Sequence, residues 1–406
     1  MPTLPDGGPA PADGSLPDDA LAELATRPFG VYVHVPYCRV RCGYCDFNTY
    51  AVTPGPEGEA TVTAYPDLVL AELDLAVNVL GDQVPEVGTV FVGGGTPTLV
   101  PGAGIVRILA GIRERWGLRA DAEVTTEANP DTVTARLAQT LAAGGVTRVS
   151  LGMQSAVPHV LGTLDRTHDP AGVARAATAL TEAGLQVSLD LIYGTPGESL
   201  TDWRISLEEA IALEPDHLSA YALTVEEGTK LAARVRRGEI PRPADDDEAD
   251  KYELADAMLA QAGYSWYEVS NWARTPADRC RHNLGYWTGA AWWGAGPGAH
   301  SHVGGVRWWN VKHPTAYESR VRAGRSPAAA REILTPLERY EEDVLLGVRL
   351  ADGMPVGRLR AAGVAAIAGL IADGLIDGQT AVRDKRIRLT QRGRLLADTV
   401  VRHLVG

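Results

Sequence analysis

The sequence predicts an α/β fold centred on a partial (β/α)6 barrel, for two reasons. From Phe29 onward, short runs of β-branched residues alternate with longer amphipathic stretches, a pattern that builds a parallel sheet. Six such units precede about residue 225, which is too few for a complete eight-fold barrel. We therefore expect the barrel at 28–225, a C-terminal α/β extension at 226–330, and a small helical or winged-helix-like domain at 331–406.

The expected strands are short and β-branched, and a helical pattern with one apolar face follows each of the first five. The first strand contains Val31, Val33 and Val35 and ends at a proline. The strands are expected at 31–36, 89–92, 123–127, 148–153, 186–192 and 217–223. The helices between them are expected at 64–80, 104–116, 132–143, 170–183 and 202–213.

The segments outside the barrel differ in composition. Residues 1–27 are rich in proline, glycine, alanine and aspartate, so we expect a disordered tail with a short helix near 18–25. This tail has neither the basic nor the apolar region of an export signal. Residues 266–309 contain seven of the nine tryptophans, and residues 385–404 are expected to form short strands and a helix.

Bulk composition limits the classes of function. The chain has 406 residues, of which 45% are hydrophobic and 22% charged, as is ordinary for a globular protein. It has no apolar run long enough to cross a bilayer, so no transmembrane segment is expected. Its formal net charge of −13 argues against broad nucleic-acid binding, which needs a basic face to neutralise phosphates.

Three cysteines lie within eight residues of one another, with the spacing C-x3-C-x2-C: Cys38, Cys42 and Cys45. Three thiolates can hold three irons of a cubic 4Fe–4S cluster and leave the fourth iron open to another molecule. A structural zinc site needs four ligands, and the remaining cysteine, Cys280, is far away in sequence. A catalytic zinc with three thiolates and water stays open as an alternative. Four cysteines do not resemble the disulfide framework of a secreted domain, and a reduced cysteine loop favours the cytoplasm.

Glycine and polar signatures follow most of the expected strands at their carboxyl ends. They are the run 93–97 after the second strand, 127–130 after the third, 154–155 after the fourth and 193–197 after the fifth. In parallel α/β folds this end of the sheet binds ligands. Together with the cysteine loop after the first strand, the pattern predicts one site at this edge.

These motifs resemble those of the radical S-adenosylmethionine (SAM) superfamily, and within it the oxygen-independent coproporphyrinogen III oxidase family. The resemblance runs from about Phe29 to the C-terminus. It implies a 4Fe–4S cluster on Cys38, Cys42 and Cys45, whose open iron is chelated by the methionine moiety of SAM. An electron from the cluster then splits SAM into methionine and a 5′-deoxyadenosyl radical, so an electron donor is implied as a partner.

The resemblance also implies the residues that contact SAM. Gly94 and Gly95 match a motif whose bare backbone lets the methionine end come close, because glycine has no Cβ. For Arg166 and Asp190, an ordinary ion pair at the barrel rim is the structural alternative. The implied SAM contacts are Tyr32, Tyr44, Gly94, Gly95, Thr96, Glu127, Gln154, Arg166, Asp190 and Ala222.

Two features distinguish subfamilies. The oxidases carry a fourth cysteine two places after the third, where this sequence has Phe47. The run from Arg281 to Trp287 contains H-N-x-x-Y-W, which is similar to the signature of the HemW-type heme chaperones. That resemblance implies heme as a cofactor and a heme-acceptor protein as a partner. It leaves open whether the chain is an enzyme, and no catalytic residue is assigned.

Several side chains near this motif could ligate heme iron, since imidazole, phenolate and thiolate all serve as heme ligands. The candidates are His282, Tyr286 and Cys280, while His300 and His302 could instead serve the metal or shape the pocket. The structural alternative is that His282 is a hydrogen-bonded core histidine and that the tryptophans are core. The alternative functions are a coproporphyrinogen III dehydrogenase in porphyrin biosynthesis, which oxidatively decarboxylates its substrate with the SAM radical, and a radical enzyme with another substrate.

Overall fold

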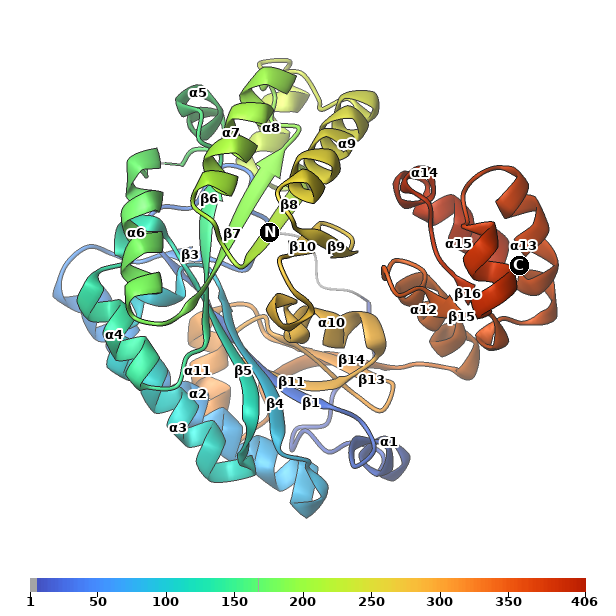
Figure 1. Ribbon diagram of the computed structural model, residues 1–406. Coiled ribbons are helices and arrows are strands. Elements are labelled where there is room, and N and C mark those ends of the chain that lie inside the picture. Colours follow the sequence, from blue (N-terminus) through green and yellow to red (C-terminus); the bar gives the residue numbers. More distant parts are fainter. Residues whose placement is uncertain (1–5, 167) are drawn as a thin grey trace.

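The computed structural model describes residues 6–166 and 168–406 (Figure 1). In this part of the chain the main sheet has twelve strands, and its centre is a parallel series of six. Each of the six overlaps one expected strand, so the predicted α/β architecture is confirmed. In their order across the sheet they are β1 (Phe29–Val35), β4 (Val87–Gly94), β5 (Leu118–Ala128), β6 (Arg148–Gln154), β7 (Gln186–Tyr193) and β8 (His217–Ala222).

The helices that follow these strands cover the outer side of the sheet (Figure 1). They pack on strand side chains such as Val31, Val33 and Val35, which are completely buried. The longest begins at Pro56 instead of residue 64, because proline suits the first helical turn, where its missing N–H has no partner to lose. The helices are α2 (Pro56–Leu80), α3 (Gly102–Trp116), α4 (Ala135–Ala143), α6 (Pro170–Glu182) and α7 (Leu200–Ala212), with the short α5 (Pro158–Thr163) before α6.

The inner side of the same strands is polar. Residues of a strand alternate between its two faces, so β5 directs Thr125 and Glu127 inward while Val124 packs in the core. Pairing between β6 and β7 sets Ser150 beside Ser188. A polar interior of this kind forms a ligand cavity rather than a second core.

The expected extension flanks both edges of the parallel series. On one side, β10 (Asn271–Ala273) pairs antiparallel with β8, and β9 (Ser265–Glu268) pairs with β10. On the other side, β11 (Ala291–Ala295) lies parallel to β1, and antiparallel partners follow it. These are β12 (His300–Val303), β13 (Val306–Asn310) and β14 (Ala328–Ile333), and the helices of this region are α8 (Lys230–Arg236), α9 (Asp245–Gln261), α10 (Arg281–Thr288) and α11 (Pro314–Arg322). In the described residues β14 and β9 stand at the two ends of the sheet, which therefore remains open.

The N-terminal segment differs from the expected disordered tail. The helix α1 (Asp18–Leu24) is present, and its Ala20 and Leu24 are buried. Further upstream, the Gly8 backbone pairs with Arg331 of β14. The composition of this segment is poor in apolar residues, but two of them spaced four apart suffice to dock one helix face. Disorder was therefore the wrong expectation for residues 6–27, while residues 1–5 lie outside the described part.

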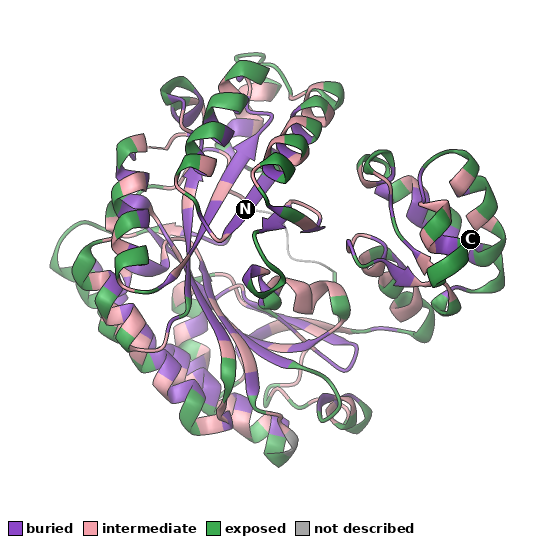
Figure 2. Cartoon of the chain, viewed as in Figure 1, coloured by how far each residue is buried: buried purple, intermediate pink, exposed green. Residues whose placement is uncertain are grey.

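The C-terminal region has a core of its own, which Figures 1 and 2 show as a separate lobe with buried segments inside it. Val344, Ile387 and Val400 are completely buried in this core. Two very short strands pair antiparallel within it. Its elements are α12 (Pro336–Gly347), β15 (Met354–Pro355), α13 (Ala361–Ala372), β16 (Arg386–Ile387), α14 (Gln391–Leu395) and α15 (Ala397–Val405). No helix in the described part of the chain is long and apolar enough to cross a membrane.

Candidate functional site

A cavity of about 600 Å³ lies at the carboxyl ends of the parallel strands and extends inward toward α10. Its volume lies within the range of small-molecule sites. Most of the residues that the sequence singled out line this one space. They are Cys38, Cys42, Tyr44, Cys45, Gly94, Gly95, Thr96, Glu127, Gln154, Arg166, Asp190, Ala222 and Cys280. Tyr32, His282 and Tyr286 do not belong to its lining.

The cysteine loop is closed at its base by two very short parallel strands, β2 (Tyr37–Cys38) and β3 (Tyr50–Ala51). All three loop thiols are free, and each has a polar neighbour. The Thr96 hydroxyl donates to Cys38 Sγ at 3.9 Å, and Arg166 Nη1 approaches Cys42 Sγ at 3.9 Å. Cys45 Sγ lies 4.0 Å from the Thr49 hydroxyl. Hydrogen-bond donors and a guanidinium of this kind stabilise thiolate ligands.

Burial controls the protonation of these thiols in the unligated chain. It raises the pKa of Cys38 to about 11, although the Thr96 hydrogen bond counteracts part of the effect. Burial also raises the pKa of Cys45. Both groups are therefore thiols at neutral pH, and binding of a metal through them has to release protons.

The glycine run after β4 lies directly against the cysteine loop. A Cβ on Gly95 would lie 2.5 Å from the Tyr37 carbonyl oxygen and 2.9 Å from Cys38 Sγ. Gly94 adopts a φ of +116°, where side chains are disfavoured, and a Cβ there would collide with the His34 ring at 2.8 Å. The sequence interpretation assigned these glycines to the approach of a ligand. The structure shows that the approach of the cysteine loop itself also requires them.

Two carboxyl groups face each other across the cavity. Burial, followed by the charge of Asp190, raises the pKa of Glu127 to about 8, against a hydrogen bond from the Gly94 N–H at 2.9 Å. Burial also raises the pKa of Asp190, which accepts a hydrogen bond from the Ser150 hydroxyl at 2.8 Å. Glu127 is thus mostly protonated at neutral pH, so it can donate a hydrogen bond to a ligand as well as accept one.

Gln154 and Arg166 also line the cavity. Gln154 has a φ of +62°, a conformation that non-glycine residues seldom adopt outside functional sites and tight turns. Arg166 Nη2 donates to the Gly152 carbonyl at 2.9 Å, while its Nε is buried without a partner. Among the described residues neither Arg166 nor Asp190 forms an ion pair. The rim ion pair that was the structural alternative for these two residues is therefore not formed.

Tyr32 does not line the cavity and contacts His34 instead. Its hydroxyl lies 2.9 Å from His34 Nδ1, and His34 Nε2 lies 2.9 Å from the carbonyl oxygen of Asn48. The Asn48 side chain in turn donates to the carbonyls of Pro297 and Lys312. The structure thus places Tyr32 in a chain of hydrogen bonds that supports the end of the cysteine loop. Sequence reasoning missed His34 and Asn48 because no motif marks them.

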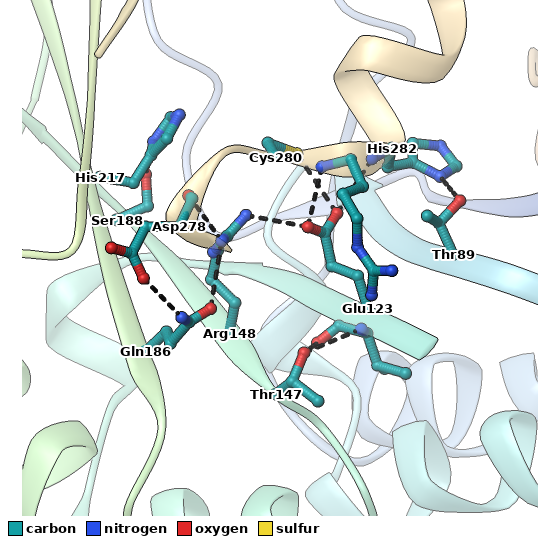
Figure 3. A network of polar contacts seen from close by, with 12 residues as sticks. Thr89, Glu123, Thr147, Arg148, Gln186, Ser188, His217, Asp278, Cys280 and His282 are labelled. Carbon is teal, nitrogen blue, oxygen red and sulfur yellow. Dashed lines mark hydrogen bonds and ion pairs between the residues drawn. The ribbon is translucent and has the colours of Figure 1, made fainter. Parts of the chain in front are cut away.

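The helix α10, which carries the H-N-x-x-Y-W motif, is anchored to the floor of the barrel (Figure 3). Glu123 of β5 accepts hydrogen bonds from the backbone N–H groups of Arg281 and His282, at 2.8 and 2.9 Å. A carboxylate at a helix N-terminus is favourable, because the first N–H groups lack intrahelical partners. Arg148 forms a buried ion pair with Glu123 at 3.2 Å and also donates to the Asp278 carbonyl. Neither Glu123 nor Arg148 was a predicted site residue, since the partners lie more than a hundred residues away in sequence.

The heme candidates occupy buried positions in this network. His282 is only 3% exposed, and its Nδ1 and Nε2 lie 2.8 Å from the hydroxyls of Thr89 and Tyr286, respectively. Burial lowers the pKa of His282 to about 3, so the ring is neutral but both nitrogens are occupied. Cys280 lines the cavity floor with its Sγ 3.6 Å from Glu123 Oε1, and burial raises the pKa of this thiol.

The two further histidines of this region differ from each other. The ring of His302 lies 3.2 Å from the Ala290 carbonyl and accepts a hydrogen bond from the Gly305 N–H. His300 is exposed, and its ring stacks on Trp309 with 5.9 Å between ring centres. Partial desolvation of the ring, followed by the charges of Lys312 and Arg307, lowers the pKa of His300.

Comparison with known proteins places this geometry in context. The sequence model of the radical SAM superfamily matches residues 32–210. A Mycobacterium tuberculosis protein named heme chaperone HemW is 52% identical over 387 residues, covering 95% of this chain and 97% of the relative. The Escherichia coli protein of the same name is 40% identical over 68% of this chain and 70% of the relative. The solved structure of Escherichia coli coproporphyrinogen III oxidase, a radical SAM enzyme, matches with a TM-score of 0.79, at 24% identity over 95% of this chain and 92% of that one.

Proposed function

The chain belongs to the radical SAM superfamily and, within it, to the HemW family, and we propose that it is a heme chaperone that binds heme and transfers it to an acceptor protein. The observation that carries the proposal is 52% identity to a curated heme chaperone over nearly the full length of both chains. The likeness to the oxidase, at 24% identity, concerns the fold alone.

The family implies a 4Fe–4S cluster, and the cysteine loop suits one. Cys38, Cys42 and Cys45 would hold it, because all three line one cavity. The backbone at Gly95 comes so close to Cys38 Sγ that a side chain there would collide with the sulfur, so the glycine allows the loop to take this position. Phe47, at the position of the oxidases' fourth cysteine, is 54% exposed and cannot ligate metal. When bound, the cluster supplies an electron to a ligand on its open iron.

The remaining lining residues fit SAM. Glu127, Gln154 and Arg166 offer hydrogen-bond donors and acceptors, of which Gln154 is buried and the other two are half-buried. The Gly94–Gly95 backbone gives close access. Tyr44, Thr96, Asp190 and Ala222 complete the proposed site. Tyr32 contributes by holding His34 and the cysteine loop in place.

The proposed partners follow from the chemistry. A cluster that delivers electrons needs an electron donor, and a heme chaperone needs a heme-acceptor protein. Free thiols on a partly exposed loop require a reducing environment, which supports a cytoplasmic location.

Two incubations under anaerobic conditions test the proposal. Titration of the reconstituted protein with heme should produce saturable absorption bands, and the heme should then move to an apo-acceptor. Incubation with SAM, a reductant and coproporphyrinogen III should leave the propionates intact. Robust formation of protoporphyrinogen would establish the dehydrogenase instead, and absence of any heme absorbance would remove the chaperone assignment.

A further inference from the structure

The environments of the nine histidines show which imidazoles can reach a heme iron. A ligand nitrogen needs a free lone pair and enough space for a flat macrocycle of porphyrin size. Four histidine rings have hydrogen-bond partners at both nitrogens: His34, His217, His282 and His302. His168 is only 4% exposed. None of these five can bind iron without rearrangement of the surrounding structure.

The other four histidines, His159, His300, His313 and His403, are exposed. His159 faces Asp202 at 3.5 Å, and His403 Nδ1 bonds to the Thr399 carbonyl in the same helix. His300 and His313 have no hydrogen bond to a ring nitrogen among the described residues. Both lie in the extension, but only the surroundings of His300 connect to the helix that carries the H-N-x-x-Y-W motif, through Trp292 and Tyr286. His313 precedes α11 and packs against Tyr50.

His300 lies in a row of aromatic side chains on one face of β11, β12 and β13. Trp309 pairs with His300 across the strands and stacks on its ring. The indole N–H of Trp292 donates to the His300 carbonyl at 3.0 Å. Trp309 is only 1% exposed and supports the His300 ring from within the sheet, whereas Trp292 is half-buried. His300 therefore offers an accessible imidazole, which can ligate heme iron, next to the indole of Trp292.

The motif helix supports this row from the side. Tyr286 packs edge-on against Trp292, with 4.7 Å between ring centres, and the Tyr286 hydroxyl lies 2.8 Å from His282 Nε2. His282 is thus three contacts removed from His300, through Tyr286 and Trp292. The motif can therefore shape a heme surface although its histidine is buried and hydrogen-bonded.

We propose that His300, the exposed first residue of β12, supplies an imidazole ligand for heme iron, and that His282 positions Tyr286 and Trp292 beside it. This inference rests on the proposed heme-chaperone function. Ligation forms one coordinate bond from the neutral imidazole to iron and displaces a weakly bound ligand such as water, without electron transfer.

An exposed histidine ligand also suits a heme that must be released to an acceptor protein. Release from His300 requires no opening of the core, and an acceptor protein can approach the heme edge from solvent. Ligation by His282 would instead require both of its hydrogen bonds to break and a ring that is 3% exposed to reach the surface. The half-buried Thr89 hydroxyl would then lose its partner, which would add to that cost.

Heme titration of the full chain tests the assignment through absorption and ferric electron paramagnetic resonance spectra. His300→Ala should lose the signature of histidine ligation and weaken heme affinity by roughly tenfold or more. His313→Ala is the matched control, because it removes another exposed imidazole without ring hydrogen bonds, and it should bind as the wild type does. His282→Gln, purified as folded protein, should keep the histidine-ligated spectrum.

Each remaining outcome is decisive. A wild-type spectrum and affinity in His300→Ala would overturn the assignment while leaving the chaperone function intact. Loss of histidine ligation in a folded His282→Gln variant, with His300→Ala unaffected, would return the role to the motif histidine. A wild-type chain that takes up no heme would overturn both this inference and the proposed function.

Discussion

Cys280 differs in its surroundings from the three cysteines of the loop, although all four thiols are free. The loop thiols lie together at the cavity mouth, whereas Cys280 faces Glu123 at the floor. Cys42→Ala should therefore abolish a reconstituted 4Fe–4S cluster, because too few thiolates remain to hold it. Cys280→Ala should retain it. Iron content and the cluster's visible absorption measure both, and a normal cluster in Cys42→Ala would refute the ligand assignment.

Glu127 makes stability depend on pH in a direction opposite to that of salt-bridged acids. Its pKa is raised to about 8 from a usual value of 4.5. Between these values the folded chain keeps a proton that the unfolded chain has lost, so the free energy of unfolding falls as pH rises. Below about pH 4.5 both states are protonated and the group contributes no pH dependence.

Glu127→Gln should remove this contribution, since the amide does not titrate. We expect the free energy of unfolding to decline less between about pH 5 and pH 8 in the variant than in the wild type, by an amount on the order of a few kcal/mol. Denaturant titrations at several pH values measure the difference. Parallel pH profiles for the two proteins would show that the Glu127 pKa is not raised.

At the scale of elements, anchoring of α10 depends on one carboxylate. Glu123→Gln leaves Arg148, which is 1% exposed, without its buried counter-charge, and weakens the hydrogen bonds to the start of α10. Loss of one partner of a buried pair costs about 3–5 kcal/mol. We expect a corresponding loss in the free energy of unfolding and faster amide hydrogen exchange in Arg281–Thr288.

Asp121 provides the matched control for this variant. It lies on the same strand and also pairs with Arg281, but both side chains are substantially exposed, at 60% and 42%. Exposed pairs contribute about 0–1 kcal/mol, so Asp121→Asn should change neither stability nor exchange appreciably. Equal effects of the two substitutions would show that burial of the Glu123–Arg148 pair does not anchor the helix.

Local sequence patterns were sufficient to predict the strands and the cysteine loop, but not the residues at the floor of the cavity. The six parallel strands follow from β-branched runs bounded by glycine and proline, and the three loop thiols follow from their spacing. The roles of Glu123, His34 and His300 depend on partners brought together only by the folded sheet. A buried His282 could not be distinguished from an exposed ligand by sequence, because the same motif letters fit both environments.

At the scale of the whole molecule, Arg394 connects the C-terminal domain to the extension of the main sheet. Its guanidinium pairs with Asp256 of α9, donates to the Tyr252 hydroxyl at 3.2 Å, and lies 4.4 Å above the Trp266 ring. The two parts have separate hydrophobic cores. Stability of the domain contact therefore depends on a few polar and cation–π interactions rather than on a shared core.

Arg394→Ala should uncouple unfolding of the two parts, because it removes these interactions at once and leaves Asp256 without its counter-charge, with only the hydrogen bond from the Trp272 indole. We expect the C-terminal domain to unfold in a separate step at lower temperature, with the barrel transition little changed. Calorimetry resolves the two steps, and amide exchange across Pro336–Val405 identifies the domain. Arg402→Ala is the control, since the Arg402 side chain bonds only within its own helix among the described contacts. A single unchanged transition in Arg394→Ala would mean that the other contacts, such as Arg279–Asp352, suffice to couple the domains.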